Sequence, residues 1–432
     1  MKLPATLRAL RYRNFQLFFG GQLISVIGTW MQNVAQAWLV YRITGSSVML
    51  GAIGFSSQIP VFLISPAAGV VADRYQRRRL VIATQTASML LAFALATLTI
   101  AGRVQVWHIF VLASMLGVVN AFDVPARQSF IVEMVGKTDL MNAIALNSSM
   151  FNASRVIGPA IAGILVARIG EGWCFFANAV SYIAVIAGLM RMRVAKREAA
   201  APSGSPVTHI VEGFLFVVRN PPVHALLVLL GIISVTGMPY AVLMPIFADR
   251  VLHGGAEALG WLMGASGVGA LGGALLLASR RDLRGLGRWV AVSATGFGAA
   301  LLAFSFSRTF WLSAVLLLPV GFAVMVEMGA SNTLIQSMVP DRLRGRVMSV
   351  YSMVFMGLAP IGSLLSGAAA GKLGAPATVA AGGGVCILAA AVFWARLPRI
   401  RVGARRLIAA QQMAGGDPPQ EMVGGSLELD PE

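Results

Sequence analysis

Residues 47–79 read SVMLGAIGFSSQIPVFLISPAAGVVADRYQRRR, an apolar run that ends in a cluster of charges. A run of this length can cross a lipid bilayer as a helix, since about 20 apolar residues suffice. Similar runs recur along the 432-residue chain, in which 57% of the residues are hydrophobic and only 12% are charged. So few charges cannot cover the surface of a soluble protein of this length. The sequence therefore predicts an all-α polytopic membrane protein.

Charged residues divide the chain into twelve apolar segments, each predicted to be a transmembrane helix. Cytoplasmic loops of membrane proteins are enriched in Lys and Arg. Of the 34 Lys and Arg residues, 27 lie in the N-terminal segment, the C-terminal segment and alternate loops; the six opposite loops carry one each, and Arg155 lies inside a span. We therefore expect a plasma (inner) membrane protein with both termini cytoplasmic. The predicted spans are 14–40, 47–72, 80–101, 104–123, 141–167, 172–190, 223–247, 258–279, 289–307, 309–331, 347–371 and 375–395.

The two halves of the chain resemble each other. Residues 117–163, shifted by 204 positions, give ten identities over 47 residues without gaps. Such internal similarity is typical of transporters built from parallel repeats. We therefore expect two pseudo-symmetric six-helix bundles around a central cavity. The expected divisions are an N-terminal bundle (1–190), a cytoplasmic linker (191–222), a C-terminal bundle (223–396) and a basic, then disordered, cytoplasmic tail (397–432).

The charge cluster quoted above begins four residues after Gly69 and reads Asp73-Arg74-Tyr75-Gln76-Arg77-Arg78-Arg79. It resembles the signature loop Gly-x-x-x-Asp-Arg-x-Gly-Arg-Arg of the major facilitator superfamily, with Gln76 in place of the second glycine. The resemblance implies a charge network with spans 4 and 11 that gates the cytoplasmic side, and it makes Asp73, Arg74 and Arg77 candidate gate residues. The alternative is a stop-transfer cluster that only sets topology, although topology requires only Lys and Arg.

Two further stretches resemble exporters of this superfamily. Gly158-Pro159-Ala-Ile-Ala-Gly163 in span 5 is similar to the antiporter motif, which implies a hinge or seal formed by a bent, closely packed helix. An ordinary proline kink is the alternative reading. The loop before span 11 resembles the branch that includes the enterobactin exporter and macrolide-efflux proteins. Its Arg342, Arg344 and Arg346 are candidate gate residues that would meet acids of the N-terminal half, or else contact anionic headgroups.

Two acids, Asp123 and Glu327, occupy equivalent positions in the internal repeat. Each follows a tryptophan at the predicted outer end of its span by sixteen residues, or about 24 Å of helix. Both are therefore predicted near the cytoplasmic face. There Asp123 would reach Arg77, and Glu327 would reach Arg280, Arg281 or Arg284. Proton carriage in the cavity is the alternative role for both acids.

Polar residues in two spans are candidates for lining the substrate cavity. In span 1 they recur at helical spacing with Asn33 beside them, as expected for a helix that borders water; hydrogen bonding between helices is the alternative. In span 5, Arg155 should face a cavity or a partner, because a buried arginine is costly in a membrane. Its role is open between a structural clamp and contact with an anionic substrate. The candidates are Gln22, Ser25, Thr29, Gln32, Asn33, Gln36 and Arg155.

These features favour a transporter. Gly264-Ala-Ser266-Gly267 matches a serine intramembrane-protease pattern, but all four histidines precede it, so no later histidine can activate the serine. No His-Glu-x-x-His zinc motif or phosphate-binding loop occurs, so we expect no metal site, no cofactor and no enzyme activity. The basic residues lie between spans rather than on one face, which excludes nucleic acid.

The predicted function is export of a small molecule of drug or siderophore type by alternating access, with protons as the coupling ion. We expect a monomer in the lipid bilayer. Uptake or facilitated diffusion of a metabolite is the alternative, because proton antiport needs a titrating group that the predicted mid-cavity lacks. An intramembrane enzyme is a distant third. The sequence does not identify the substrate.

Overall fold

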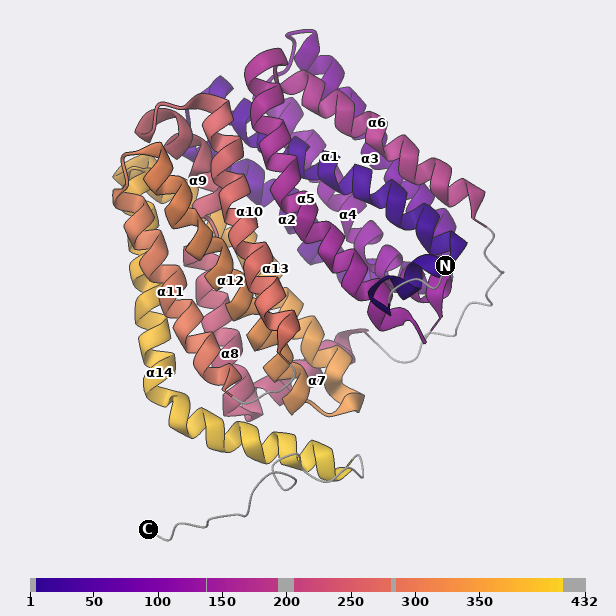
Figure 1. The fold of residues 1–432 in the computed structure, drawn as a ribbon, viewed down its shortest axis with the longest axis vertical. Helices are drawn as coiled ribbons and strands as arrows, with labels where there is room; N and C mark the ends of the chain where they lie inside the picture. The colour runs from indigo at the N-terminus through magenta and orange to yellow at the C-terminus, as the bar shows by residue number, and fades with distance from the viewer. Residues whose placement is uncertain (1–4, 137, 193–205, 281–284, 415–432) are drawn as a thin grey trace.

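The computed structural model describes residues 5–136, 138–192, 206–280 and 285–414, apart from the side chains of residues 5, 6, 66, 67, 69, 70, 72–74, 206–210 and 412–414. The described chain is almost entirely helical (Figure 1). Its first part contains η1 (Ala5–Arg11), α1 (Arg13–Thr44), α2 (Ser47–Arg74), α3 (Arg77–Ile100), α4 (Val106–Val135), α5 (Leu140–Ile169), α6 (Glu171–Arg191) and α7 (Pro206–Arg219). Its second part contains α8 (Pro221–Ile232), the π-helix η2 (Ile233–Gly237), α9 (Tyr240–Ile246), the π-helix η3 (Phe247–Val251), α10 (Gly255–Ser279), α11 (Leu286–Phe306), α12 (Phe310–Met338), α13 (Asp341–Leu373) and α14 (Ala375–Ala414).

Eleven helical segments of the described chain are long and apolar enough to cross a membrane. One of them, Pro221–Val251, joins α8, η2, α9 and η3. Helix α1 corresponds to the first predicted span and has 32 residues, about 48 Å of helix, but it is not among the eleven. Its glutamines and asparagine dilute its apolar character. The chain is thus a multi-pass, all-helical membrane protein.

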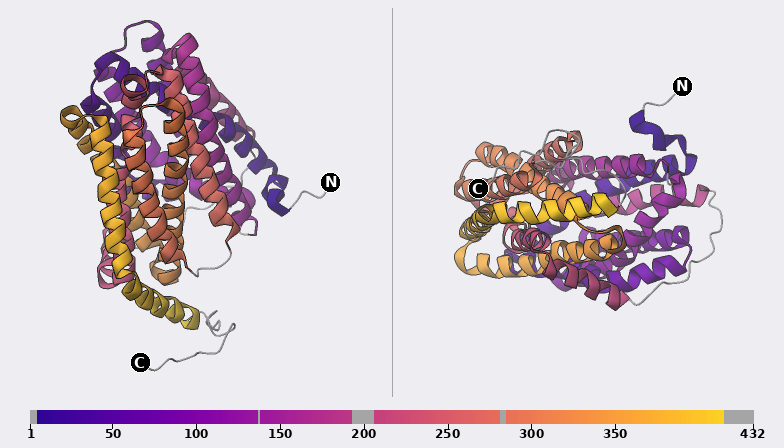
Figure 2. Two further views of the ribbon diagram at one scale, coloured as in Figure 1. Left: turned by 60° about the vertical axis from the view of Figure 1, so that its left-hand side comes forward. Right: turned by 90° about the horizontal axis from the view of Figure 1, so that it is seen from below.

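Several helices extend past their predicted ends. Helix α4 continues to Val135, although the predicted span ended at 123, and α12 continues to Met338 instead of 331. The expected linker contains α7, and α14 runs on to Ala414 through a bend at Pro398 (Figures 1 and 2). Residues 415–432 of the predicted tail lie outside the described residues.

The helices pack in two groups: α1–α6, from the first part of the chain, form one group, and α8–α14, from the second part, form the other. Helices α1–α6 contact one another mainly through the pairs α1–α6, α1–α5, α2–α4, α3–α6 and α3–α4; in the second group, α8–α14, the main pairs are α10–α12, α11–α14 and α11–α12. Two pairs dominate the contacts between the groups, α5 with α10 and α2 with α13. In Figure 1 the two groups lie close together near the top of the view and diverge below.

The repeat seen in the sequence reappears in the helix positions. Helices α4, α5 and α6 begin at residues 106, 140 and 171, and α12, α13 and α14 begin at 310, 341 and 375. The shift is 204, 201 and 204 residues. Because α5 and α13 are equivalent in this repeat, the contacts α5–α10 and α13–α2 occupy corresponding places in the two groups.

Candidate functional site

The two helix groups contact most closely at one end. We call the end at which α1 begins the inner end and the end at which α1 finishes the outer end. Near the outer end, a Cβ added to Gly163 of α5 would lie 2.9 Å from the Cα of Gly260 of α10. At the corresponding place, a Cβ on Gly367 of α13 would lie 2.9 Å from the Cα of Gly51 of α2. Only glycine permits backbones to approach this closely, so these pairs hold the two groups in close contact near the outer end.

A polar contact joins the groups beside these glycine pairs. The Tyr41 hydroxyl, in the last turn of α1, donates a 2.7 Å hydrogen bond to Asp249 Oδ2 of η3. Arg250 Nε donates to the same hydroxyl at 3.1 Å, and its Nη2 donates to the Gly45 carbonyl at 3.0 Å. Gly45 ends α1 in the left-handed region, with φ of 59°, which directs that carbonyl toward the second group. We refer to Tyr41, Gly45, Asp249 and Arg250 as the outer latch.

Arg155 lies in the middle of α5, at the boundary between the groups. Its backbone carbonyl abuts α10, since a Cβ on Gly267 would lie 2.8 Å from it. The guanidinium carbon lies 5.9 Å from the centre of the Trp30 ring of α1, within the range of a cation–π contact. Phe151 packs edge-on against the same ring at 5.6 Å between centroids. The side chain is half-buried, and no carboxylate of the described residues pairs with it.

The antiporter-like motif serves two different contacts. A Cβ on Gly158 would lie 2.5 Å from the Trp30 Cβ, so this glycine brings α5 against α1 within the first group. Gly163 instead faces α10 in the second group. Pro159 is buried between them inside a continuous helix. The motif therefore places two contacts on one helix: the contact with Trp30, beside Arg155, and the glycine contact with α10 near the outer end.

The polar face of α1 divides between buried and accessible positions. Gln22 and Gln32 are buried and accept hydrogen bonds from Arg127 Nη1 at 3.1 Å and from Asn178 Nδ2 at 2.7 Å. Thr29 donates to the Ser25 carbonyl of its own helix. These contacts fit the alternative of hydrogen bonding between and within helices. Asn33 is exposed and Gln36 is half-buried, so these two residues retain access to a ligand.

Asp123 is the centre of a buried network inside the first group. Its Oδ1 accepts from Thr84 Oγ1 at 2.7 Å and from Gln85 Nε2 at 2.9 Å, and its Oδ2 lies 3.4 Å from Arg127 Nε. The expected pairing with Arg77 does not appear among these contacts. The reason is the length of α4: the helix continues twelve residues beyond Asp123, so the acid lies about 18 Å from its end.

Arg77 forms an ion pair with Glu133 and not with the expected partner, Asp123. Its Nη1 lies 3.0 Å from Glu133 Oε1, near the inner end of α4, and also donates to the Ser129 carbonyl at 3.2 Å. Both side chains of this pair are about one-sixth exposed. Asp73 and Arg74 belong to the last turn of α2, but their side chains lie outside the described residues, so their predicted contacts stay predictions.

Glu327 has the position of Asp123 in the second group but not its partners. The residue is completely buried, and its Oε1 accepts a 3.1 Å hydrogen bond from Ser331. Its Oε2 has no hydrogen-bond partner among the described residues. No ion pair of the described residues includes it. The expected partner Arg280 instead stacks over Trp289 at 4.5 Å, and Arg281 and Arg284 lie outside the described residues.

The arginines before span 11 make local contacts at the start of α13. Arg344 lies 2.5 Å from Asp341 of the same turn, and Arg346 forms an ion pair with Glu212 of α7. Arg342 is exposed. None of the ion pairs described for these arginines reaches the first group. The predicted gate also includes Asp73 and Arg74, so it stays a prediction.

Some residues of the site were missed by sequence reasoning. Arg250 was counted only as a loop charge, and Tyr41 and Asp249 were not considered, because the latch joins residues 208 positions apart. Arg127 was assigned to the loop between spans 4 and 5, and Glu133 was not considered, because α4 was predicted to end before them. No cluster of three or more His, Cys, Asp or Glu side chains suitable for a metal occurs within the described ranges.

Comparison with known proteins gives a family match over nearly the whole chain. A family model described as "Transmembrane secretion effector" matches residues 4–420. The chain is 28% identical to the Staphyloferrin A transporter of Staphylococcus aureus, covering 81% of this chain and 87% of that one. It is 28% identical to the multidrug efflux pump Tap of Mycolicibacterium fortuitum (80% and 86%) and 24% identical to the enterobactin exporter of Shigella boydii (78% and 80%).

Solved structures share the fold. A transporter of the POT family in complex with 5-aminolevulinic acid superposes with a TM-score of 0.73 at 11% identity, covering 90% of this chain and 97% of that chain.

Proposed function

Because the chain belongs to the transmembrane secretion effector family of the major facilitator superfamily, we propose that it exports a small molecule across the plasma (inner) membrane, with both termini cytoplasmic. The single observation that carries the proposal is the placement of Arg155. It is a cation without a carboxylate partner among the described residues, midway along a helix that joins the two groups. The similarity to siderophore and drug transporters supports the direction and the substrate class.

In this proposal the two groups, with α1 completing a set of twelve spans, form two six-helix bundles that move by alternating access. The two glycine pairs and the outer latch support assigning the present arrangement to a state closed at the outer end. In the opposite state the inner ends would close, and Asp73, Arg74 and Arg77 would meet Arg342, Arg344 and Arg346 and their acidic neighbours. The ion pairs Arg77–Glu133 and Arg346–Glu212 hold these arginines within their own halves until then.

The proposed substrate site is the space between Arg155, Trp30 and Asn33. A guanidinium beside an aromatic face binds a flat or anionic group well, because it offers both charge and a stacking surface. Buried Asn152, one turn before Arg155, has an unsatisfied Oδ1 that can accept a hydrogen bond from a ligand. The guanidinium favours a substrate with a carboxylate or another anionic group over a lipophilic cation, and Asn152 Oδ1 favours a donor group elsewhere on that substrate.

Glu327 is the proposed proton carrier. An unpaired carboxylate inside a protein costs several kcal/mol, and binding a proton removes that cost. A movement of α12 that gave Glu327 access to water would let the proton leave. Asp123 is unsuited to this role, because Arg127, Thr84 and Gln85 already stabilise its charge.

The test is substrate-driven proton flux in energised everted vesicles, followed with a pH-sensitive dye while siderophores, macrolides and lipophilic dyes are added. We expect an anionic compound to collapse the gradient with the natural protein. Arg155→Gln should abolish the response, whereas Arg168→Gln, an exposed arginine near the end of the same helix, should retain it.

Two outcomes would contradict the proposal. An equal loss with anionic and neutral substrates in Arg155→Gln would assign Arg155 a structural role. Flux of a labelled compound into cells would favour uptake. Flux that does not depend on the proton gradient would favour facilitated diffusion.

A further inference from the structure

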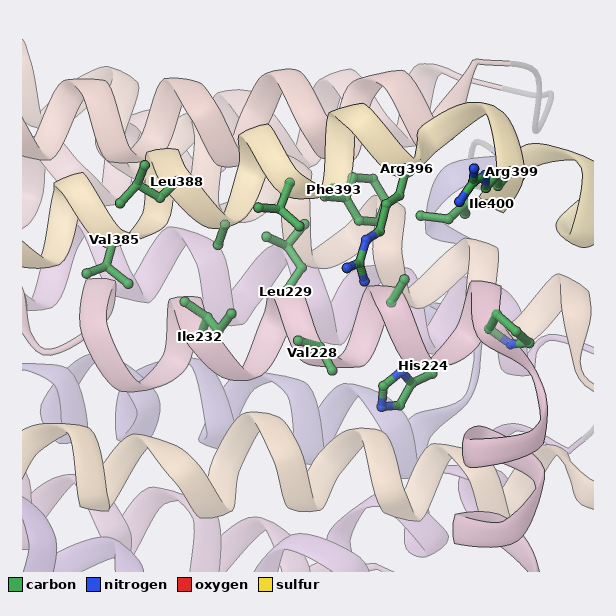
Figure 3. A pocket seen from close by; sticks show the side chains of 14 residues that line it. His224, Val228, Leu229, Ile232, Val385, Leu388, Phe393, Arg396, Arg399 and Ile400 are labelled. Atoms are coloured by element: carbon green, nitrogen blue, oxygen red, sulfur yellow. The ribbon is translucent and has the colours of Figure 1, made fainter.

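A groove runs along the outside of the second helix group, between α8 and α14 (Figure 3). It has a volume of about 560 Å³. Its walls are apolar: Val228 and Ile232 on α8 face Val385, Leu388 and Val392 on α14. Four of these five side chains are at least 40% exposed, and buried Leu229 and Phe393 form the floor. The groove lies on helices that cross the membrane, so its natural surroundings are lipid chains.

The groove is as long as one leaflet is thick. From Ala375, where α14 begins, to Arg396 the helix rises about 31 Å, which matches the hydrocarbon core of about 30 Å. Arg396 therefore lies at the inner boundary of the core. Val385, eleven residues earlier, is about 16 Å deeper, near the midplane. A single acyl chain extending from the inner boundary would fill this length.

The inner end of the groove is cationic. Arg396 extends from α14 toward α8, His224 lies opposite on α8, and Arg399 follows at the next turn (Figure 3). No hydrogen bond or ion pair of the described residues satisfies these three side chains. The next arginine, Arg401, lies close enough to Arg288 and Arg405 for like-charge repulsion. This end of the groove therefore lacks a negative charge.

We propose that the groove binds one anionic phospholipid of the leaflet at the inner end. The phosphate lies between Arg396 and Arg399, His224 donates a hydrogen bond to it, and an acyl chain lies against Val228, Leu388 and Val392. Charge complementarity selects the headgroup, since each basic residue near a membrane surface attracts anionic lipid. The bend at Pro398 supports this placement, because it turns the rest of α14 away from the span at the level of the headgroups.

Native mass spectrometry of the purified full-length protein, titrated with phosphatidylglycerol or phosphatidylcholine, tests the site. The natural protein should bind one phosphatidylglycerol about thirtyfold more tightly than phosphatidylcholine, the combined effect of two basic residues. Arg396→Gln/Arg399→Gln should remove this preference. The matched control Arg405→Gln/Arg406→Gln removes the same charge from the same helix beyond the groove and should keep it.

A second variant tests the chain-binding part of the groove. Ala389→Phe places a ring among the apolar walls without changing a charge, and it should weaken binding of both lipids. Inorganic phosphate at millimolar concentration should not displace the lipid, because it lacks the acyl chain. Equal binding of the two lipids by the natural protein would overturn the proposal. A preference that survives in Arg396→Gln/Arg399→Gln, or that is lost equally in the control, would do the same.

Discussion

Asp123 and Glu327 occupy equivalent positions in the two halves of the molecule, but their surroundings differ. Both carboxyl groups are almost fully buried. Asp123 is held by a guanidinium, a hydroxyl and an amide, whereas the Ser331 hydroxyl is the one partner of Glu327 in the part of the chain that the structure describes. The residue equivalent to Arg127 is Ser331 in the second half. At this position the second half therefore lacks the guanidinium that pairs with Asp123 in the first half.

The difference indicates how a duplicated protein can divide its tasks. A buried charge with a full set of partners stabilises one arrangement of helices, whereas a buried acid without a counter-charge responds to its surroundings. In the proposed function, the network around Asp123 holds the first half in one arrangement, and Glu327 couples the arrangement of the second half to a proton. Each of the following predictions would sharpen or break this division.

The largest effect is expected from Glu327→Gln, which fixes the side chain in a neutral form. Substrate-driven proton flux in everted vesicles should fall to the level of vesicles without substrate. The thermal unfolding temperature should stay the same or rise, because a neutral amide needs no counter-charge inside the protein. Proton flux equal to that of the natural protein would contradict the comparison. Glu171→Gln serves as a control, because this acid pairs with Arg42 at the outer end of the first half and has no proposed role in gating.

The converse result is expected from Asp123→Asn. The change leaves Arg127 facing an amide in place of a carboxylate, and we expect a loss of about 2 kcal/mol, the range of charged hydrogen bonds. Unfolding followed by intrinsic fluorescence in detergent should show a lower transition temperature. The double variant Asp123→Asn/Arg127→Gln should recover part of the loss; if it is less stable still, the pair is not a unit.

A smaller and symmetric effect is expected from Gly163→Ala and Gly367→Ala. Each added Cβ would lie 2.9 Å from a Cα of the facing helix in the state closed at the outer end. The clash should cost about 1–3 kcal/mol in that state alone. Spin labels can be placed on the outer ends of α1 and η3 after Cys174 and Cys386 are replaced by alanine. Electron paramagnetic resonance should then show longer distances between the two labels in both variants. A shift in one variant only would contradict the equivalence of the two contacts.

The smallest effect is expected from Tyr41→Phe in the outer latch. The variant loses the hydroxyl between Asp249 and Arg250 but keeps the ring, so we expect a change of about 1 kcal/mol toward opening. The same spin-label distances report it. Tyr12→Phe is a suitable control, because its hydroxyl contacts Asp139 within the first group.

The helical class, the multi-pass organisation and the family were predictable from the sequence, because long apolar runs and the loop after Gly69 depend on local composition. The ends of α4 and α12 were not, because polar residues such as Arg127 and Asn332 continue these helices after the apolar run has stopped. That error placed Asp123 too close to the end of its helix and paired it with Arg77, whereas Thr84, Gln85 and Arg127 are its partners.

The contacts between the groups needed the structure for a different reason. Tyr41 and Asp249 are ordinary residues at the ends of two spans, and only the packing of α1 beside η3 brings them together. Arg155 was recognisable from its cost in a membrane, but its Trp30 partner was not, because the stacking depends on how Gly158 draws α5 against α1.

The position of α7 has a consequence for the reach of the connection between the halves. Gly213 of α7 abuts the Arg346 carbonyl of α13, and Glu212 pairs with the Arg346 side chain, so α7 belongs to the inner end of the second group. The connection that spans the two groups therefore runs only from Arg191 to Pro206. Fifteen residues reach at most about 50 Å when fully extended. In the proposed alternating access, this connection limits how far the inner ends can separate. Each residue deleted between Arg191 and Pro206 would lower the largest separation that they can attain.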